Sequence, residues 1–480
     1  MLDMKEVARI INNLGYRTMT FDYGIYYKYI ANCFNWYKGK TPGHTYKYYN
    51  GHKSITVEKA KLFMAKRVCE DIASLVCNEN MIICVDGKEE NKYLLGNDSM
   101  TGILGQNDFW SQFNKCYELT AGLGTGAMEV VVENLLSYDD RLLSNDNTKI
   151  KIARYDALHV LPITWDNNGN ITEVCFLDEY QVRKDKFLEL RLHVKNEQGN
   201  YVIINRKCKI NDIVGQDQIN KFIYVDNSTL VNEFDTGSNI PWFICMKMPQ
   251  INSYDITSPM GASCYGDSTD ALMACDDGFD AFCGDLKTSY KKTYYDKRLL
   301  DRNSKGDIII PDDNFVNNNI YFVGDGESPV DSKELIKEYE PTIRSKELTE
   351  AIDLALDILS FKVGLGHGYY KFSSNGVQKT ATEVVNSNAD LYRSVCKMQL
   401  GIEKNIYDII KALLYASNYV FKTNYNLNVK MSVNFDVSLI EDKTKERERA
   451  LREVELGILT KNEYRSKYYS DLGDIVEPKN

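Results

Sequence analysis

The sequence predicts an α+β protein in which a strand-rich middle region lies between two helical regions. From about residue 125 to residue 250, apolar and polar residues alternate with a period of two, as in half-buried strands. Before and after this region, apolar residues recur at steps of three and four, the spacing of amphipathic helices. The chain has 480 residues, 43% of them hydrophobic, so we expect several domains with a real core.

The first predicted region, residues 1–124, is helical. Between residues 60 and 75 the apolar positions follow helical spacing, at Leu62, Ala65, Val68, Ile72 and Leu75. Residues 125–266 follow as a β-rich region, whose short strands are MEVVVEN, KIKIAR, ITEVCFLD, FLELRLHV and YVIINRK. In FLELRLHV, Arg191 and His193 alternate with apolar residues, so we expect a sheet with one face in solvent.

Two long helices are predicted next, over residues 267–297 and 342–363, and a small mixed module over residues 298–341 separates them. In this module, 307–311 and 320–323 have strand-like patterns. One face of the first helix is apolar, with Leu272, Cys275, Phe279, Phe282, Leu286 and Tyr290. The opposite face is acidic at its start and basic at its end, as the helix dipole favours, with Asp276, Asp280, Asp285, Lys287 and Lys291.

A glycine-broken loop over residues 364–380 follows the second helix. Gly364 is predicted to end that helix in the left-handed conformation. Gly366 and Gly368 either let the loop change shape or form one fixed tight turn, and the sequence leaves both open. A capping box of Thr380 and Glu383 then begins a long helix over residues 381–420. Residues 421–480 have further helical character, with Gly457 as a helix end and Thr460 to Glu463 as a second capping box.

The motifs that resemble catalytic or nucleotide-binding sites lack a required part. Gly122, Gly124 and Gly126 precede a strand, whereas a dinucleotide fingerprint lies between a strand and a helix. Lys379 lacks the glycine that precedes the lysine of a phosphate-binding loop. Ser263 lies in a segment that is one residue too long for a nucleophile elbow.

Metal-site signals are equally weak. The five histidines are scattered, with no zinc-binding spacing. Three pairs of adjacent aspartates could serve a metal-dependent nuclease, but adjacent residues in a helix point apart and in loops are usually solvated: Asp139-Asp140, Asp276-Asp277 and Asp312-Asp313. The sequence therefore predicts no catalytic, cofactor or metal site, and a metal-dependent nucleic-acid-processing enzyme remains the alternative.

The composition argues against some classes of binding partner and location. The formal net charge of −10 argues against a protein that grips nucleic acid over a broad surface, because such binding needs an excess of Lys and Arg. We expect no transmembrane helix, since no run of about 18 apolar residues occurs. Twelve cysteines without a C-x-x-C pair predict free, buried thiols in a reducing compartment.

Several segments together carry a family resemblance. They are LALDILSFKVGLGHGYYKF, KTATEVVNSNADLYR, MAKRVCEDIASLVCNE and the long stretch IPWFICMKMPQINSYDITSPMGASCYGDSTDALMACDDGFDAF. Through these segments and the order of its modules, the chain resembles the portal proteins of tailed bacteriophages, in the branch from long-tailed phages and prophages of Gram-positive bacteria. Matches lie along most of the chain, while the region after residue 420 is matched mainly by its helical character.

The resemblance implies a structural protein and no enzyme or cofactor. Portal proteins form rings, usually of twelve subunits, at one vertex of the capsid, and double-stranded DNA is packaged and later ejected through the ring. The implied partners are other copies of the chain, the DNA, the terminase large subunit, a head-completion or adaptor protein, and the capsid and scaffolding proteins, with no membrane. The implied location is the virion's portal vertex, and the host cytoplasm during assembly.

The resemblance also gives names to the predicted modules. Residues 1–124 would be the helical part of the wing, and 125–266 its β-rich part. Residues 267–297 and 342–363 would be the two stem helices. Residues 298–341 would be the clip, 364–380 the tunnel loop, 381–420 the helix behind it and 421–480 the helical crown.

Under this resemblance the tunnel loop faces DNA. Its DNA-facing residues would be Gly364, Gly366, Gly368, Tyr369, Tyr370, Lys371 and Lys379. Twelve copies at −10 each would carry −120, so the channel wall would repel the DNA backbone while sparse lysines made weak phosphate contacts. Lys371 and Lys379 are the main candidates and Lys362 a weaker one, with ordinary solvated lysines as the alternative. The two tyrosines are expected to pack between neighbouring loops.

Overall fold

The structure, a computed structural model, describes residues 4–41, 43–49, 53–77, 81–97, 101–138, 141–209, 223–224, 230–296, 299, 302–306, 309, 320–323, 336–372, 381–435, 451–452 and 454. The chain forms two compact units, each built from separated segments. The first unit comprises Met1–Lys38, Ala65–Asp267 and Lys379–Asn480, and the second comprises Gly39–Met64 and Ser268–Gln378. Both contain helices and strands, so the predicted α+β class is confirmed.

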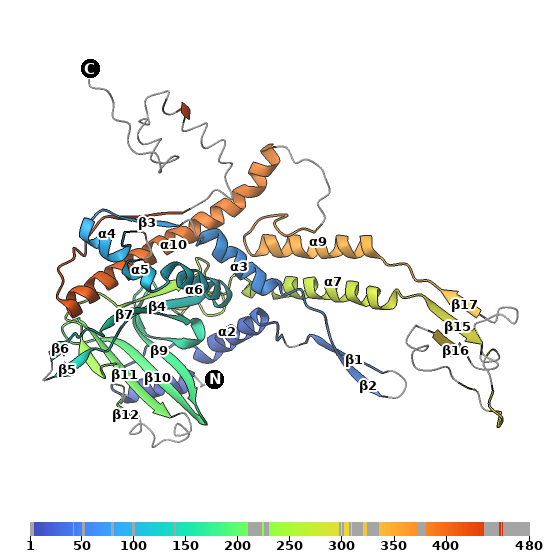
Figure 1. Cartoon of the computed structure of the whole chain (residues 1–480), viewed down its shortest axis with the longest axis horizontal. Coiled ribbons are helices and arrows are strands. Elements are labelled where there is room, and N and C mark those ends of the chain that lie inside the picture. The colour runs from blue at the N-terminus through green and yellow to red at the C-terminus, as the bar shows by residue number, and fades with distance from the viewer. Residues whose placement is uncertain are drawn as a thin grey trace. The chain divides into compact units, whose positions relative to one another are not determined.

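The first unit contains two larger antiparallel sheets (Figure 1). One has the order β12-β11-β10-β9-β8, with β13 also paired to β11, and the other has the order β14-β4-β7. Smaller pairs are β5 with β6 and β18 with β3. The strands are β3 (Ile82–Val85), β4 (Thr125–Glu133), β5 (Leu136–Tyr138), β6 (Arg141–Leu143), β7 (Lys149–Asp156), β8 (Val160–Trp165), β9 (Ile171–Val182), β10 (Asp185–Lys195), β11 (Tyr201–Lys209), β12 (Ile223–Tyr224), β13 (Glu233–Asp235), β14 (Phe243–Lys247) and β18 (Met431–Asn434).

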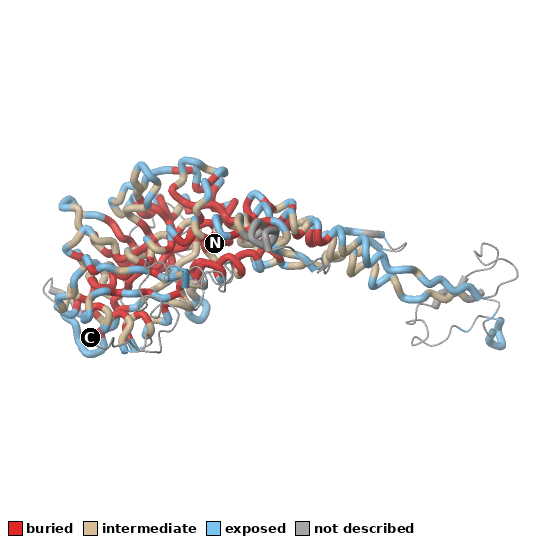
Figure 2. The backbone as a smooth tube through the Cα atoms, turned by 90° about the horizontal axis from the view of Figure 1, so that it is seen from above, coloured by how far each residue is buried: buried red, intermediate tan, exposed pale blue. Residues whose placement is uncertain are grey.

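Helices cover these sheets. The longest, α10, packs against β4 and β14, and α6 packs against β4 and β7. Much of the backbone in this unit is buried, which Figure 2 shows in red. The helices are α1 (Met4–Asn13), α2 (Tyr23–Tyr37), α3 (Met64–Val76), α4 (Lys88–Leu94), α5 (Ile103–Gln106), α6 (Phe109–Leu123) and α10 (Ala381–Phe421), with short 3₁₀ turns at Ala157–His159 and Gly266–Ser268.

All five predicted strands of the β-rich region are confirmed, as β4, β7, β9, β10 and β11. The predicted wet face of β10 is wrong. His193 is fully buried and the Arg191 side chain is only 15% exposed, because both contact Glu129 of β4. A second sheet therefore covers the face that the alternation assigned to solvent. An alternating strand with polar residues on one face cannot by itself distinguish water from a buried ion pair.

The second unit is built on two antiparallel helices, α7 (Thr269–Thr288) and α9 (Ser345–Lys362), which lie side by side (Figure 1). Beyond them lies a three-stranded sheet with β15 (Lys292–Asp296) at its centre, parallel to β16 (Ile320–Val323) and antiparallel to β17 (Ile336–Tyr339). The unit also includes a two-stranded hairpin of β1 (Thr45–Tyr49) and β2 (Ser54–Glu58).

Three predicted boundaries need correction. The region 1–124 is not helical throughout, since it contains β1, β2 and β3, and Gly39–Met64 belongs to the second unit. The first long helix ends at Thr288, short of residue 297, and Lys292 begins a strand. The run TYYD extends the apolar pattern, but β-branched and aromatic residues favour a strand, which here pairs with β16 and β17.

Other predictions agree with the structure. The second long helix, predicted over 342–363, is α9, and the helix predicted over 381–420 is α10. The strand-like pattern at 320–323 is β16. The strand-like pattern at 307–311 lies outside the described residues except at position 309, as do Thr380, Gly457 and the capping box at 460–463.

Candidate functional site at the end of helix α9

The glycine loop after α9 depends on a close pairing of α7 with α9. Ile352, Leu356 and Leu359 form the buried face of α9. Opposite them, a Cβ atom added at Gly278 of α7 would lie only 2.9 Å from Ile352 Cγ1. Gly278 thus lets the two helices approach at this level, where any side chain would force Ile352 to move.

An ion pair joins the C-terminal part of α7 to the N-terminal end of α9. Arg344, just before α9, donates from Nε and Nη2 to the two carboxylate oxygens of Asp285 on α7, at 3.0 and 2.7 Å. This two-point geometry is the strong form of an arginine–carboxylate contact. The hydrogen bonds from Arg344 lower the pKa of Asp285.

Helix α9 ends as the sequence predicted. Gly364 has a φ of +82°, in the left-handed region. Its amide donates to Phe361 O at 3.2 Å, and the Leu365 amide donates to Ser360 O at 2.9 Å. These two bonds form the Schellman motif, in which glycine at this position reverses the chain direction. Leu365 is then buried, which anchors the start of the loop.

The described part of the loop is tied to α9 by side chains of the helix itself. Asp357 accepts a hydrogen bond from the Gly368 amide and also contacts His367 Nδ1 at 3.3 Å. The Tyr370 amide donates to Ser360 Oγ at 3.1 Å, and the Phe372 amide donates to Asp353 Oδ1 at 2.8 Å. Alternate backbone amides of the loop are therefore bound by one face of α9.

Aromatic rings add to this attachment. The His367 ring stacks on Phe361, with centroids 4.7 Å apart and planes 17° from parallel. Tyr369 and Tyr370 contact each other edge to face, with centroids 4.9 Å apart. Gly366 and Gly368 have φ values of +82° and +74°, so both use the conformation that glycine adopts most easily. The structure thus gives each loop glycine a conformational role up to residue 372.

The loop's described cation, Lys371, is exposed, and Lys362 at the end of α9 is exposed as well. Lys379 lies outside the described residues. Of the predicted DNA-facing residues, the structure therefore brings together Gly364, Gly366, Gly368, Tyr369, Tyr370 and Lys371 in one segment folded back on α9. Sequence reasoning missed Asp353, Asp357 and Ser360, although two aspartates four residues apart in the otherwise apolar run IDLALDIL were a usable signal.

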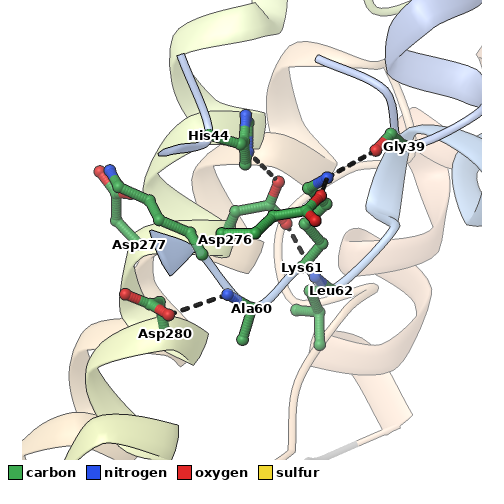
Figure 3. A network of polar contacts seen from close by, with 10 residues as sticks. Gly39, His44, Ala60, Lys61, Leu62, Asp276, Asp277 and Asp280 are labelled. Atoms are coloured by element: carbon green, nitrogen blue, oxygen red, sulfur yellow. Dashed lines mark hydrogen bonds and ion pairs between the residues drawn. The ribbon is translucent and has the colours of Figure 1, made fainter. Parts of the chain in front are cut away.

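A second polar network holds the base of the β1–β2 hairpin on α7 (Figure 3). Asp276 accepts from the Leu62 amide at 2.8 Å and contacts His44 Nε2 at 2.7 Å, while Asp280 accepts from the Ala60 amide at 2.8 Å. Lys59 pairs with Asp277 at 2.7 Å, which raises the pKa of Lys59. These aspartates serve as hairpin anchors. Asp276 is buried, contrary to its predicted place on the polar face.

The buried face between the two sheets of the first unit holds the other charged cluster. Glu129 contacts His193 Nε2 at 2.9 Å and Arg191 Nη1 at 3.3 Å, and accepts from the Tyr155 hydroxyl at 2.8 Å. Burial alone would raise the pKa of Glu129, but the Arg191 charge and the hydrogen bonds from His193 and Tyr155 lower it overall. The cluster stabilises the packing of the two sheets.

The glycine motif at residues 122–126 and the segment around Ser263 have structural roles. Gly124 has a φ of +83° and ends α6, and β4 follows at once, so the order is helix then strand. Ser263 is buried, its amide donates to the Tyr29 hydroxyl at 3.1 Å, and its Oγ accepts from the Tyr265 amide at 3.4 Å. Among the described residues, no three His, Cys, Asp or Glu side chains gather closely enough to hold a metal ion.

Every helix in the described part of the chain is too short or too polar to cross a lipid bilayer. No protein-family model matches the chain, and a search of curated proteins finds no match.

Proposed function

We propose that this chain is the subunit of a portal ring, the channel at one capsid vertex through which double-stranded DNA is packaged and ejected. The observation that carries the proposal is the order of elements around α9. Helix α9 pairs with α7, has a small sheet beyond its N-terminal end, and passes at its C-terminal end into a glycine loop that leads to a 41-residue helix. This order supports the assignment of α7 and α9 as stem helices, of the small sheet as the clip and of the glycine loop as the tunnel loop.

The geometry of the loop supports a surface that contacts a passing polymer. The described part of the loop is tied to α9 by Asp353, Asp357 and Ser360, and it carries the exposed cation Lys371. An isolated cation contributes a weak phosphate contact that does not depend on sequence and weakens with salt. Such a contact suits DNA that must slide past without being held.

The net charge of −10 supports the same proposal. In a ring, the subunits' negative charges would add, and a channel lined by like charge repels the DNA backbone over roughly one Debye length, about 8 Å at physiological salt. The proposed partners are further copies of the chain, the DNA, the terminase large subunit, a head-completion or adaptor protein, and the capsid and scaffolding proteins. The small sheet of β15, β16 and β17 is the proposed docking site for the terminase and adaptor.

Electron microscopy of the purified full-length chain tests the proposal. We expect rings with a central hole wide enough for duplex DNA, and a mass measured by light scattering that is a whole multiple of 55.1 kDa. A chain that stays monomeric at every concentration and salt tried would overturn the proposal. A metal-dependent cleavage of DNA by the monomer would favour the nuclease alternative instead.

A further inference from the structure

Helix α7 carries the β1–β2 hairpin and helix α9 on nearly opposite sides. Asp276 and Asp280 anchor the hairpin base, whereas Gly278 faces Ile352 of α9. Gly278 is two residues from each of these aspartates, and two residues turn an α-helix by about 200°. Figure 1 shows the hairpin on the side of α7 away from α9. The hairpin of one chain therefore cannot cover the α9 of the same chain.

The outer side of α9 has an apolar stripe that faces away from α7. The α9 stripe consists of Leu354, Ile358 and Phe361, which are 61%, 46% and 57% exposed. Leu354 is two residues from Ile352, the residue that contacts α7, so the same rotation of about 200° puts the stripe opposite α7. Side chains this apolar in a continuous exposed row are typical of a protein–protein contact. Glu347 and Glu350, both exposed, extend the row toward the helix N-terminus.

The hairpin has an apolar face of its own. Tyr46 pairs directly with Val57, and Ile55 lies two residues from Val57, so all three side chains lie on one face. Tyr46 is 43% exposed, and Ile55 and Val57 are half-buried. Lys53 directly precedes β2, on the side of the hairpin tip, and is exposed. A lone two-stranded hairpin is marginally stable in water, so covering this face would stabilise it.

The two surfaces match in length, polarity and charge. On the hairpin, Lys53 precedes Val57 by four residues, which span at most about 13 Å of extended chain. On α9, Ile358 and Glu350 are eight helical residues apart, about 12 Å. The hairpin extends from base to tip in the direction in which α7 runs, and hence from the C-terminal toward the N-terminal end of α9 (Figure 1). If one copy is displaced sideways relative to the next, the apolar side chains of its hairpin therefore align with those of the neighbouring α9. The same displacement brings Lys53 beside the glutamates of that helix.

We propose that the β1–β2 hairpin of one copy docks on the α9 stripe of the next copy. The proposal rests on the ring function proposed above and names a contact between its neighbouring subunits. Two different complementary faces on opposite sides of one body make a head-to-tail contact, and such contacts build closed rings when the rotation between copies closes. Tyr46, Ile55 and Val57 cover Leu354, Ile358 and Phe361, and Lys53 lies beside Glu350. The contact between His44 and Asp276 then holds the base of the β1–β2 hairpin in place on α7.

Charge exchange within the full-length chain tests this contact. Lys53→Glu and Glu350→Lys should each raise the concentration needed for assembly by about tenfold, the effect of losing roughly 1.4 kcal/mol per contact. The double variant Lys53→Glu with Glu350→Lys should restore assembly, because every contact in the ring regains one opposite-charge pair. Light scattering across a dilution series gives the midpoint for each variant, and circular dichroism shows whether the chain is folded.

Apolar substitutions make a second, independent test. Tyr46→Glu and Leu354→Glu should each abolish assembly, while Ile256→Glu, at an 81% exposed isoleucine of the first unit, should leave it intact. Rings that persist in Tyr46→Glu and Leu354→Glu would overturn the docking contact and leave the ring proposal standing. A double charge variant that assembles no better than the single variants would also overturn the contact. An unmodified chain that never assembles would overturn the ring proposal itself.

Discussion

Asp276 and His44 are joined across 2.7 Å, from Oδ2 to Nε2, and both side chains are buried. The carboxylate's other oxygen accepts from the Leu62 amide at 2.8 Å. His44 precedes β1 and Leu62 follows β2. One carboxylate therefore binds the start and the end of the β1–β2 hairpin. Its neighbour Asp277 pairs with Lys59 and is 48% exposed. The two adjacent aspartates therefore make a matched pair for testing the anchor.

Asp276→Ala should release the hairpin. It leaves the buried imidazole of His44 and the partly buried amide of Leu62 without their shared carboxylate, and the expected cost is about 3 kcal/mol. Asp277→Ala removes an exposed ion pair and should cost less than about 1 kcal/mol. Limited proteolysis between residues 44 and 62 measures the difference, with Asp276→Ala cleaved at least tenfold faster than the unmodified chain. Equal cleavage of the two variants would contradict the anchor.

Gly364→Ala should destabilise the end of α9. Its φ of +82° costs an alanine about 1–2 kcal/mol. Gly401→Ala is the control, because Gly401 lies inside α10 with open space around its Cα. There, alanine should instead stabilise the helix by about 1 kcal/mol. Thermal unfolding of both variants checks the opposite signs, and a stabilising Gly364→Ala would refute the Schellman cap.

The strands of the β-rich region and the end of α9 could be predicted from the sequence, because both depend on local patterns. Period-two alternation gave β9, β10 and β11, and Gly364 gave the end of α9, since only glycine adopts that φ readily. The 20 residues of α7 were predicted with an end several residues too late, because the strand at Lys292–Asp296 forms only through pairing with β16 and β17.

What the sequence could not give were contacts between distant segments. His44 and Asp276 are 232 residues apart, and nothing in either segment indicates the other. Glu129 lies on one predicted strand, and Arg191 and His193 lie together on another. The pattern of β10 alone predicted water where the structure has a second sheet. At the candidate site, the loop residues were predicted, but the α9 side chains that bind their amides were not. Long-range pairing decides both cases.

Asp357→Ala should free the loop from α9. The change removes the acceptor of the Gly368 amide and the contact with His367. A hydrogen bond to a charged group contributes about 1.5–3 kcal/mol, so amide exchange at residues 368–370 should quicken by roughly 10- to 100-fold. Asp390→Ala, which removes an exposed helical carboxylate paired with Arg393, should leave that exchange unchanged. Unchanged exchange in Asp357→Ala would show that the tie is dispensable.

Glu129 should make the first unit sensitive to acid. Its pKa is lowered in the folded chain from a reference value of 4.5. A carboxyl with a depressed folded pKa contributes stability that is fully present above its unfolded pKa, and the contribution is lost as pH falls through the folded pKa. We therefore expect stability to decline as the pH falls below about 4.5.

Glu129→Gln tests that assignment. The variant should be about 3 kcal/mol less stable at pH 7, because the buried Arg191 loses the carboxylate at 3.3 Å and keeps Glu189, whose nearest oxygen is 3.8 Å away. Its stability should then fall less steeply than that of the unmodified chain below pH 4.5. The control is Glu133→Gln, on the same strand, where Glu133 pairs with the half-exposed Lys151 at 2.7 Å. Denaturant unfolding at several pH values gives both slopes, and parallel slopes for Glu129→Gln and the unmodified chain would contradict the assignment.

Charge reversal on the loop tests the proposed DNA contact. Lys371→Glu with Lys379→Glu replaces two cations per subunit by anions, and a ring repeats that change in every copy. Repulsion between these carboxylates and the phosphates should reduce the DNA packaged or retained by at least about tenfold, and low salt should deepen the loss. Lys346→Glu, at an exposed lysine in the first turn of α9, is the matched control and should package normally. If the loop variant forms rings and packages DNA as fully as this control, the lysines are solvated surface residues without a role in DNA passage. A defect that appears only after packaging, as early loss of DNA, would assign the contact to retention.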